Sequence, residues 1–331
     1  MKPTIEHKAQ NFFYTVLALT RRNMLLFLRN KTTIFFSIVA PVLLLTINTL
    51  FLGNLGVSQM QEALSENGYD GMFTDSQLRT VVDTWMVSGV LSMATLTVAL
   101  NSMFVMISDK EKHIRDDFQA SPVSEVALAL SYALSSLILT MSICIIFLFI
   151  CLIYLYISSQ TVLDVSQIFE SIGIIIMGSL SAVLFLMCIT TLFKRTSTAT
   201  SFAGIFSALI GFLIGAYLPP LILPYALRQF SNFLPGTHIT SLFRLCLMRN
   251  AIEPIQAKLN TSDFSQLADD FGTDINMFGV SFDKWAMCLF VTGVIILCFL
   301  IYLLEAYLQH RKISKPERKL NQIAHNLVDR K

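Results

Sequence analysis

The segment 109–124 places charged side chains in an otherwise apolar chain, and their types suit polar docking rather than bond-making chemistry. It reads DKEKHIRDDFQASPVS and lies between two long apolar runs. Asp109 can cap a short helix, Glu111 and Arg115 can pair one turn apart, and Pro122 can end the helix. The pattern favours a docking helix. The alternative is an ordinary charged loop that only sets membrane topology.

A second candidate, residues 11–30, precedes the first apolar run. Thr15, Arg22 and Arg29 are seven residues apart and share one helical face, while apolar residues fill most of the remainder. This pattern predicts an amphipathic helix in the membrane interface. We favour contact with a partner protein over a membrane anchor or a simple lead-in to the first span.

A third candidate, residues 234–244, reads LPGTHITSLFR and follows three prolines in 219–224. The prolines break the fifth apolar run near its end. The segment is too short and too polar to cross a bilayer, so it predicts a re-entrant or outer helical hairpin that gates the outer side, with Pro235 and Thr237. For Arg244 we favour an interface arginine reaching toward water over a buried functional one.

Motifs for catalysis or metal binding are absent from the sequence. It lacks GxxxxGK[ST], HExxH, GxSxG and CxxC, and five of its six cysteines fall in apolar runs. The acids of those runs are Glu170 and Glu305, both near run ends. Carriers driven by protons or sodium usually need acids within the membrane. We therefore expect no cofactor, metal or nucleic acid to bind this chain, and energy to come from a partner.

The composition predicts an all-α integral membrane protein. Apolar residues make up 54% of the chain, charged residues 14%, and mean hydropathy is +0.63; soluble proteins carry roughly 25% charge. No signal peptide is expected. Six runs reach the length of ~20 residues that a span needs. The predicted organisation is an N-terminus at 1–32, spans at about 33–53, 85–107, 126–157, 168–193, 202–223 and 285–308, outer loops at 54–84 and 224–284, and a basic tail at 309–331.

Lys and Arg set the expected orientation. Of the 24 such residues, 18 lie in 1–32, in the loops at 109–125 and 194–201, and in the tail. Basic loops stay in the cytoplasm. Both termini are therefore predicted to be cytoplasmic, in the plasma membrane of a bacterium.

This order of elements resembles the permease subunit of ABC-2 type exporters. In that family a glutamate and then a Pro-Val-Ser corner precede the third span, as Glu111 and 122–124 do here, and an arginine precedes a proline in the first span, as Arg29 and Pro41 do. Before the last span, the family segment is matched by Pro235, Thr237 and Arg244. The chain departs from the family at His113, where glycine is frequent, at Ser131-Tyr132, where Gly-Lys is common, and at Ser241, where glutamate is usual.

The resemblance implies a fold like the type V exporters: six transmembrane helices, an N-terminal interface helix, a cytoplasmic coupling helix at 109–121, and the outer hairpin. It also implies a separate nucleotide-binding ATPase subunit, which holds ATP-Mg, and a second copy or homologous permease. Contact with the ATPase is expected from Glu111, Arg115, Phe118, Arg22 and Arg29. Dimer contact, through spans one and five, is expected to include Gly204, Gly211 and Gly215, small residues that allow close helix approach.

The implied function is ATP-driven export of a drug, peptide or lipid-like molecule. Two other classes stay open: a membrane-embedded immunity or sensor protein without transport, and a secondary carrier. A neighbouring gene for a P-loop ATPase would favour the exporter, and an ATP-independent phenotype would favour the others.

Overall fold

The computed structural model describes residues 5–66, 68–121, 123–219, 222–258 and 271–305. Six helical segments within them are long and apolar enough to cross a membrane. The prediction of an all-α membrane protein with six spans is therefore confirmed, and the predicted basic tail lies outside the described residues. The six segments are Lys31–Glu66, Asp75–Glu111, Glu125–Ser159, Val165–Thr190, Thr196–Leu213 and Lys284–Glu305.

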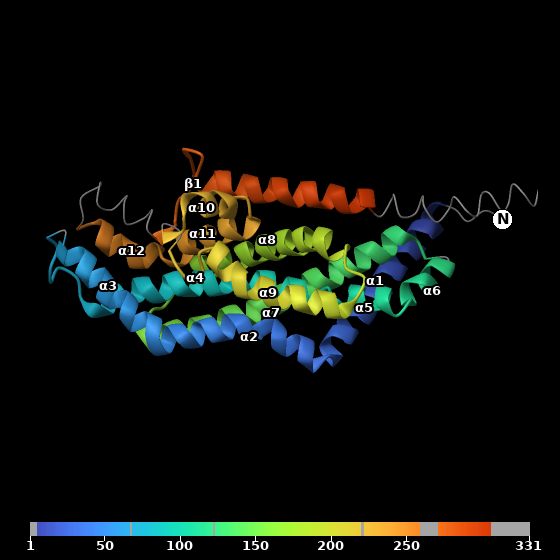
Figure 1. Ribbon diagram of the computed structural model, residues 1–331, viewed down its shortest axis with the longest axis horizontal. Coiled ribbons are helices and arrows are strands. Elements are labelled where there is room, and N and C mark those ends of the chain that lie inside the picture. Colours follow the sequence, from blue (N-terminus) through green and yellow to red (C-terminus); the bar gives the residue numbers. More distant parts are fainter. Residues whose placement is uncertain (1–4, 67, 122, 220–221, 259–270, 306–331) are drawn as a thin grey trace, which may run out of the picture.

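The labelled elements appear in Figure 1. The last span, Lys284–Glu305, has no label of its own. In chain order the elements are α1 (Ile5–Arg29), α2 (Lys31–Ile47), the π-helix η1 (Asn48–Leu52), α3 (Gly53–Glu66), α4 (Asp75–Ser102), α5 (Phe104–Glu111), α6 (Ile114–Ala120), α7 (Glu125–Ser159), α8 (Val165–Thr190), α9 (Thr196–Leu213), α10 (Tyr225–Asn232), α11 (Pro235–Leu247), α12 (Arg249–Gln256), β1 (Ile275–Met277) and β2 (Val280–Phe282).

The centre of the bundle is α4, which packs against α2, α7, α8 and α11. All of its residues from Val81 to Ser102 are buried. Small residues allow this close packing: a Cβ on Gly89 would lie 2.8 Å from the Cα of Ala216. The buried hydroxyls of α4 mostly return to its own carbonyls, as Ser88 does to Thr84 at 2.8 Å. A helix with many serines and threonines can therefore be buried while most of its hydroxyls remain hydrogen-bonded.

The first two spans reach further than hydropathy predicted. Helix continues from α2 through η1 and α3 to Glu66, and α4 already begins at Asp75, so most of the predicted outer loop at 54–84 is helical. Thr74 starts α4 with a capping box, in which its hydroxyl accepts from Gln77 N. Trp85, the first residue of the predicted second span, instead lies within α4 and is only 7% exposed.

The third span lies within two residues of its predicted bounds, whereas the fifth begins and ends earlier than predicted. At 35 residues, α7 is about 52 Å long and exceeds a hydrocarbon core of about 30 Å. Its start is capped by Ser124, whose hydroxyl accepts from Ala127 N at 3.1 Å. The fifth span, α9, ends at Leu213 because the chain turns at Gly215, where φ is 71°. The break thus precedes the prolines.

The two ends of the bundle carry different elements. Figure 1 places α1, α5 and α6 at one end and α3 and α12 at the other. Between spans five and six, α10 and α11 form the predicted helical hairpin. The 13-residue α11 is too short to cross a bilayer, and it is buried against α4 and α8.

Candidate functional site

The charged loop folds into two short helices with a sharp corner between them. α5 ends at Glu111, and α6 begins at Ile114. His113 forms the corner in the left-handed conformation, with φ 59° and ψ 11°. Glycine is frequent at this place in the resembled family, because glycine adopts that conformation without steric cost. The docking helix predicted over 109–121 is thus shorter, and Pro122 lies outside the described residues.

Asp109 joins the loop to the N-terminal helix. It does not cap a helix but is buried near the end of α5, with its side chain 4% exposed. Both of its oxygens accept hydrogen bonds from the Arg22 guanidinium of α1, one of them at 2.9 Å. The Tyr132 hydroxyl of α7 donates to the same carboxylate at 2.6 Å. A buried charge needs such pairing, and the bond to Asp109 raises the pKa of Arg22. The three residues tie α1, α5 and α7 together.

Phe118 of α6 packs onto this cluster. The Arg22 guanidinium carbon lies 5.4 Å from the centre of the Phe118 ring, a cation–π contact. Phe118 is half-buried against the core, so it faces back to the bundle. The exposed side of α6 carries Asp116 and Asp117, with His113 beside them at 2.8 Å from Asp116. The surface that α6 offers outward is therefore acidic.

Glu111 and Arg115 do not pair with each other, because the corner at His113 separates them. Glu111 accepts from the backbone N of Thr196 at 3.0 Å, and also from its hydroxyl, at the start of α9. A carboxylate is favourable at a helix N-terminus. Arg115 donates to Glu125 at 3.0 Å, at the start of α7. The loop is thus bonded to α9 and, for a second time, to α7.

A last set of bonds reaches the C-terminal span. Lys110 donates to the carbonyl of Thr191, just past α8, at 2.8 Å. The Thr191 hydroxyl donates to Glu305 at 2.9 Å. Arg29, by contrast, is exposed in the last turn of α1. Displacement of the 109–121 segment would therefore act on α1, α7, α9 and the last span together.

At the opposite end of the bundle, Arg244 is 1% exposed, so the prediction of an arginine reaching to water was wrong. Its guanidinium donates to the carbonyls of Gly215 and Gly272 and lies 4.7 Å from the Trp85 ring centre. Burial lowers its pKa to about 9, so it remains charged at neutral pH. Arg244 joins α11 to the turn after α9, to the chain before β1, and to α4.

The other two predicted gate residues shape the turn between α10 and α11. Pro235 occupies the first turn of α11, where its fixed φ suits a helix start. The Thr237 hydroxyl donates to the carbonyl of Ser231 at 2.6 Å. His238 Nε2 lies 2.8 Å from the carbonyl of Asn232, and its ring stacks on Phe290 at 4.1 Å. All three hold the hairpin in its position.

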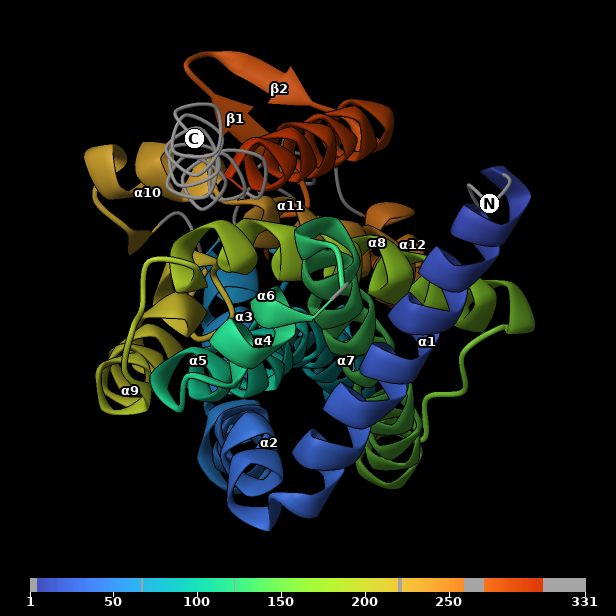
Figure 2. The same ribbon diagram turned by 90° about the vertical axis from the view of Figure 1, so that its right-hand side faces the viewer.

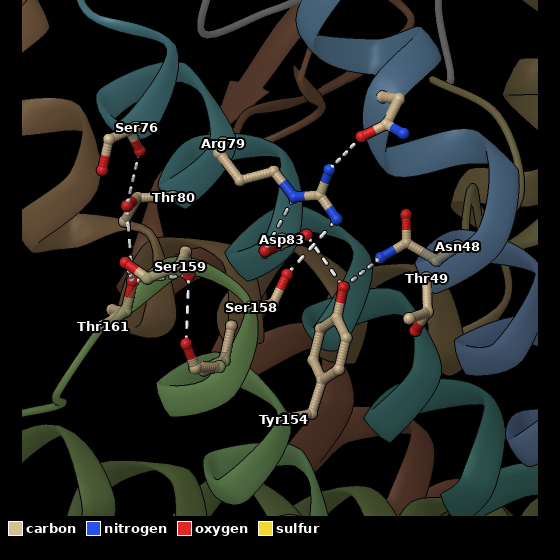
Figure 3. A network of polar contacts seen from close by, with 12 residues as sticks. Asn48, Thr49, Ser76, Arg79, Thr80, Asp83, Tyr154, Ser158, Ser159 and Thr161 are labelled. Carbon is tan, nitrogen blue, oxygen red and sulfur yellow. Dashed lines mark hydrogen bonds and ion pairs between the residues drawn. The ribbon is translucent and has the colours of Figure 1, made fainter.

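A polar network inside the bundle was missed by sequence reasoning (Figure 3). Asp83, assigned to an outer loop, has a fully buried side chain on α4. It accepts from Arg79 Nε at 3.3 Å and from the Tyr154 hydroxyl at 2.9 Å. Asn48, at the start of the π-helix, donates to the Tyr154 hydroxyl at 3.0 Å. The network links the π-helix, α4 and α7; π-helical turns often occur at functional sites.

The three candidate glycines lie in different surroundings. Gly204 is exposed on α9, with open space where a Cβ would be. A Cβ on Gly211 would lie 2.4 Å from the Tyr217 ring, and Gly215 forms the turn. Packing against Tyr217 explains the glycine at 211, and the turn explains the glycine at 215, without any dimer contact. Dimer contact stays a prediction, and Gly204 is the member of the set that faces outward.

Two adjoining pockets lie beside α9: the first is lined mainly by α1, α5 and α9, and the second lies in the groove between α2 and α9. One, of about 440 Å³, includes Arg22 and Lys112, and the other, of about 350 Å³, includes Asn101. Thr33, Phe104 and Thr200 line both pockets. The first pocket has polar and charged side chains along much of its wall, including Asp109, whereas the second is mainly apolar, with hydroxyl and amide groups spaced along it.

Comparison with known proteins assigns the chain to one family. A family model described as ABC-2 type transporter matches residues 14–248. The match runs from α1 to the end of α11, well over half of the chain. No curated protein matches the chain.

Proposed function

The chain belongs to the ABC-2 type transporter family, and we propose that it is the permease subunit of an ATP-driven exporter whose ATPase is a separate chain. Family membership makes it a membrane permease of an ABC transporter. The ATPase would hold ATP-Mg, since the sequence has no phosphate-binding loop. The observation that carries the proposal is the charged segment, bonded to four different spans or helices and presenting α6 outward.

In this proposal α6 is the coupling helix. Its exposed Asp116 and Asp117 would meet a basic surface of the ATPase. Glu111, Arg115, Phe118 and Arg22 would act mainly as positioning residues, because each is bonded or packed within the permease. Exposed Arg29 would supply part of a second contact from α1. ATP-driven movement of the ATPase would then be passed to the spans through the bonds at Glu111, Arg115 and Asp109.

The transport path would form between two such permeases, either two copies or this chain and a homologous one. The groove between α2 and α9 supports this, because both helices expose large apolar residues such as Phe36 and Leu209. The mainly apolar pocket between α2 and α9, with its scattered hydroxyls, suits a drug, peptide or lipid-like cargo. Positive residues gather at the end that holds α1 and α6, which supports cytoplasmic termini in a bacterial plasma membrane.

Co-purification from native membranes tests the proposal. Mass spectrometry should find a stoichiometric P-loop ATPase bound to the wild-type chain. Asp116→Lys with Asp117→Lys should release it. The matched control is Glu62→Lys with Glu66→Lys on α3, which makes the same charge change at the far end of the bundle. If the chain works in cells and binds no ATPase, the exporter proposal fails, and the immunity and carrier classes return.

A further inference from the structure

The β-hairpin before the last span ends in an unusual turn. β1 and β2 pair antiparallel and are joined by Phe278 and Gly279. Both residues have positive φ, 52° and 87°. Turns of this kind strongly prefer Asn-Gly, because a bulky side chain at positive φ is sterically unfavourable. An aromatic residue at the tip, 63% exposed, therefore needs a reason other than the turn.

The hairpin is held firmly against α10. Phe278 N donates to the Gln229 side chain at 3.1 Å, and the Asn232 amide donates to the carbonyl of Asn276 at 2.9 Å. Ile275 is buried beneath the first strand. These bonds fix the direction of the tip, so the exposure of Phe278 does not come from a loose loop.

Exposed apolar side chains occur at the tip and in the segments next to it. Phe233, at the end of α10, lies with its ring centre 6.1 Å from that of Phe278. We call Phe233, Phe278, Val280 and Trp285 the hairpin patch; their exposed fractions are 53%, 63%, 62% and 74%. Grouped aromatic residues at this exposure mark an interaction surface on a protein.

The hairpin patch continues into the surface of the last span. Asp283 directly follows β2 and accepts from Ala286 N at 2.9 Å, starting the helix. Trp285 and Leu289 of that helix are both more than 70% exposed. Figure 2 places the hairpin beside this span, on the side of the bundle opposite α2. The patch thus adjoins an exposed apolar face of the last span, away from the groove between α2 and α9.

We propose that the hairpin patch is a membrane anchor that sits in the headgroup–acyl boundary of the leaflet where the last span begins. Trp favours this zone, Phe is among the residues that enter it on interfacial helices, and a bilayer would cover the exposed rings without a protein partner. Because the hairpin is bonded to α10, which precedes α11, the anchor would hold the α10–α11 hairpin at a fixed depth. This inference stands independently of the ATPase.

Depth-dependent fluorescence quenching tests the anchor. Phe278→Trp is made in a Trp285→Phe background, and the signal of the buried Trp85 is subtracted with the parent variant. The full chain is placed in nanodiscs containing brominated lipids. The matched control is Met72→Trp, an exposed apolar position in the turn before α4. We expect severalfold stronger quenching by bromine at Phe278→Trp than at Met72→Trp.

Two outcomes would overturn the anchor. Equal quenching of both reporters by aqueous iodide would place the hairpin in water. Protection from bromine and iodide alike would mean that a protein, such as a second copy, covers the patch. If Phe278→Trp does not fold, Val280→Trp gives the same reading, because strand geometry accepts tryptophan readily.

Discussion

Arg22 on α1 and Asp109 near the end of α5 form a bidentate ion pair between residues that are 87 positions apart in the sequence. The pair lies where the N-terminal helix crosses the charged segment, and Tyr132 completes it. It bonds the N-terminal helix directly to the charged segment, and in the proposed function it would make that helix part of the coupling structure.

Asp109→Asn should therefore destabilise the protein. It leaves the Arg22 charge partly buried without its counter-ion, at a cost of roughly 1–3 kcal/mol, less than for a fully buried pair because Arg22 retains some exposure. Denaturant titration in mixed micelles measures the free energy of unfolding. Asp116→Asn, on the exposed side of α6, is the control and should change it by less than about 0.5 kcal/mol. Equal losses in both variants would contradict the role of the pair.

Glu111→Gln combined with Phe118→Ala should lower transport-coupled ATP hydrolysis severalfold while membrane insertion stays normal. The first change weakens the bond to the start of α9, and the second removes packing on Arg22. ATPase activity of the reconstituted complex, with and without cargo, is the measurement. Glu66→Gln on α3 serves as the control. Normal coupled turnover in the double variant would sink the assignment of the coupling segment.

Tyr154→Phe should reveal the strength of the network in Figure 3. Without the hydroxyl, Asp83 loses a donor and Asn48 loses an acceptor. Leaving such buried groups unsatisfied costs about 1–3 kcal/mol. Tyr156→Phe lies two residues further on the same helix, is 64% exposed, and should be nearly neutral. Unfolding in micelles compares the two, and indistinguishable curves would argue against the network.

Stability should fall as the pH is lowered, in part through His238. Burial lowers the pKa of His238 to about 4, below its ordinary value near 6.5. The unfolded chain therefore binds the extra proton first, so stability is complete above about pH 6.5 and declines toward pH 4, by at most about 1.4 kcal/mol per pH unit. His238→Gln should flatten this slope in unfolding measured from pH 7 to 5. If the unfolding free energies of wild type and variant fall in parallel with pH, His238 is not the source of the pH dependence.

The six spans could be predicted because hydropathy and length decide whether a helix suits a bilayer. The ends of the first, second and fifth spans could not, since they depend on local contacts. The early start of α4 rests on the Thr74 cap, and the early end of α9 rests on the turn at Gly215. Both lie in stretches where hydropathy changes gradually.

The site was less predictable, because its bonds depend on elements distant in sequence. The spacing of Glu111 and Arg115 suggested a pair, yet the left-handed His113 redirects each to a different span. Asp83 was hidden because Arg79, one turn earlier, makes the segment look like a polar loop. Arg244 was interpreted as an interface residue because its acceptors are backbone carbonyls. Residue types in the sequence do not show which carbonyls will face a buried arginine.

The unbroken helix α7 has a consequence for how the two faces of the membrane are connected. Glu125, bonded to the charged segment, and Tyr154, in the polar network, stand on one rod about 43 Å apart. When α7 tilts as a rigid body, its two ends move in opposite directions. The continuous helix therefore connects the charged segment at one end of the bundle directly to the polar network at the other.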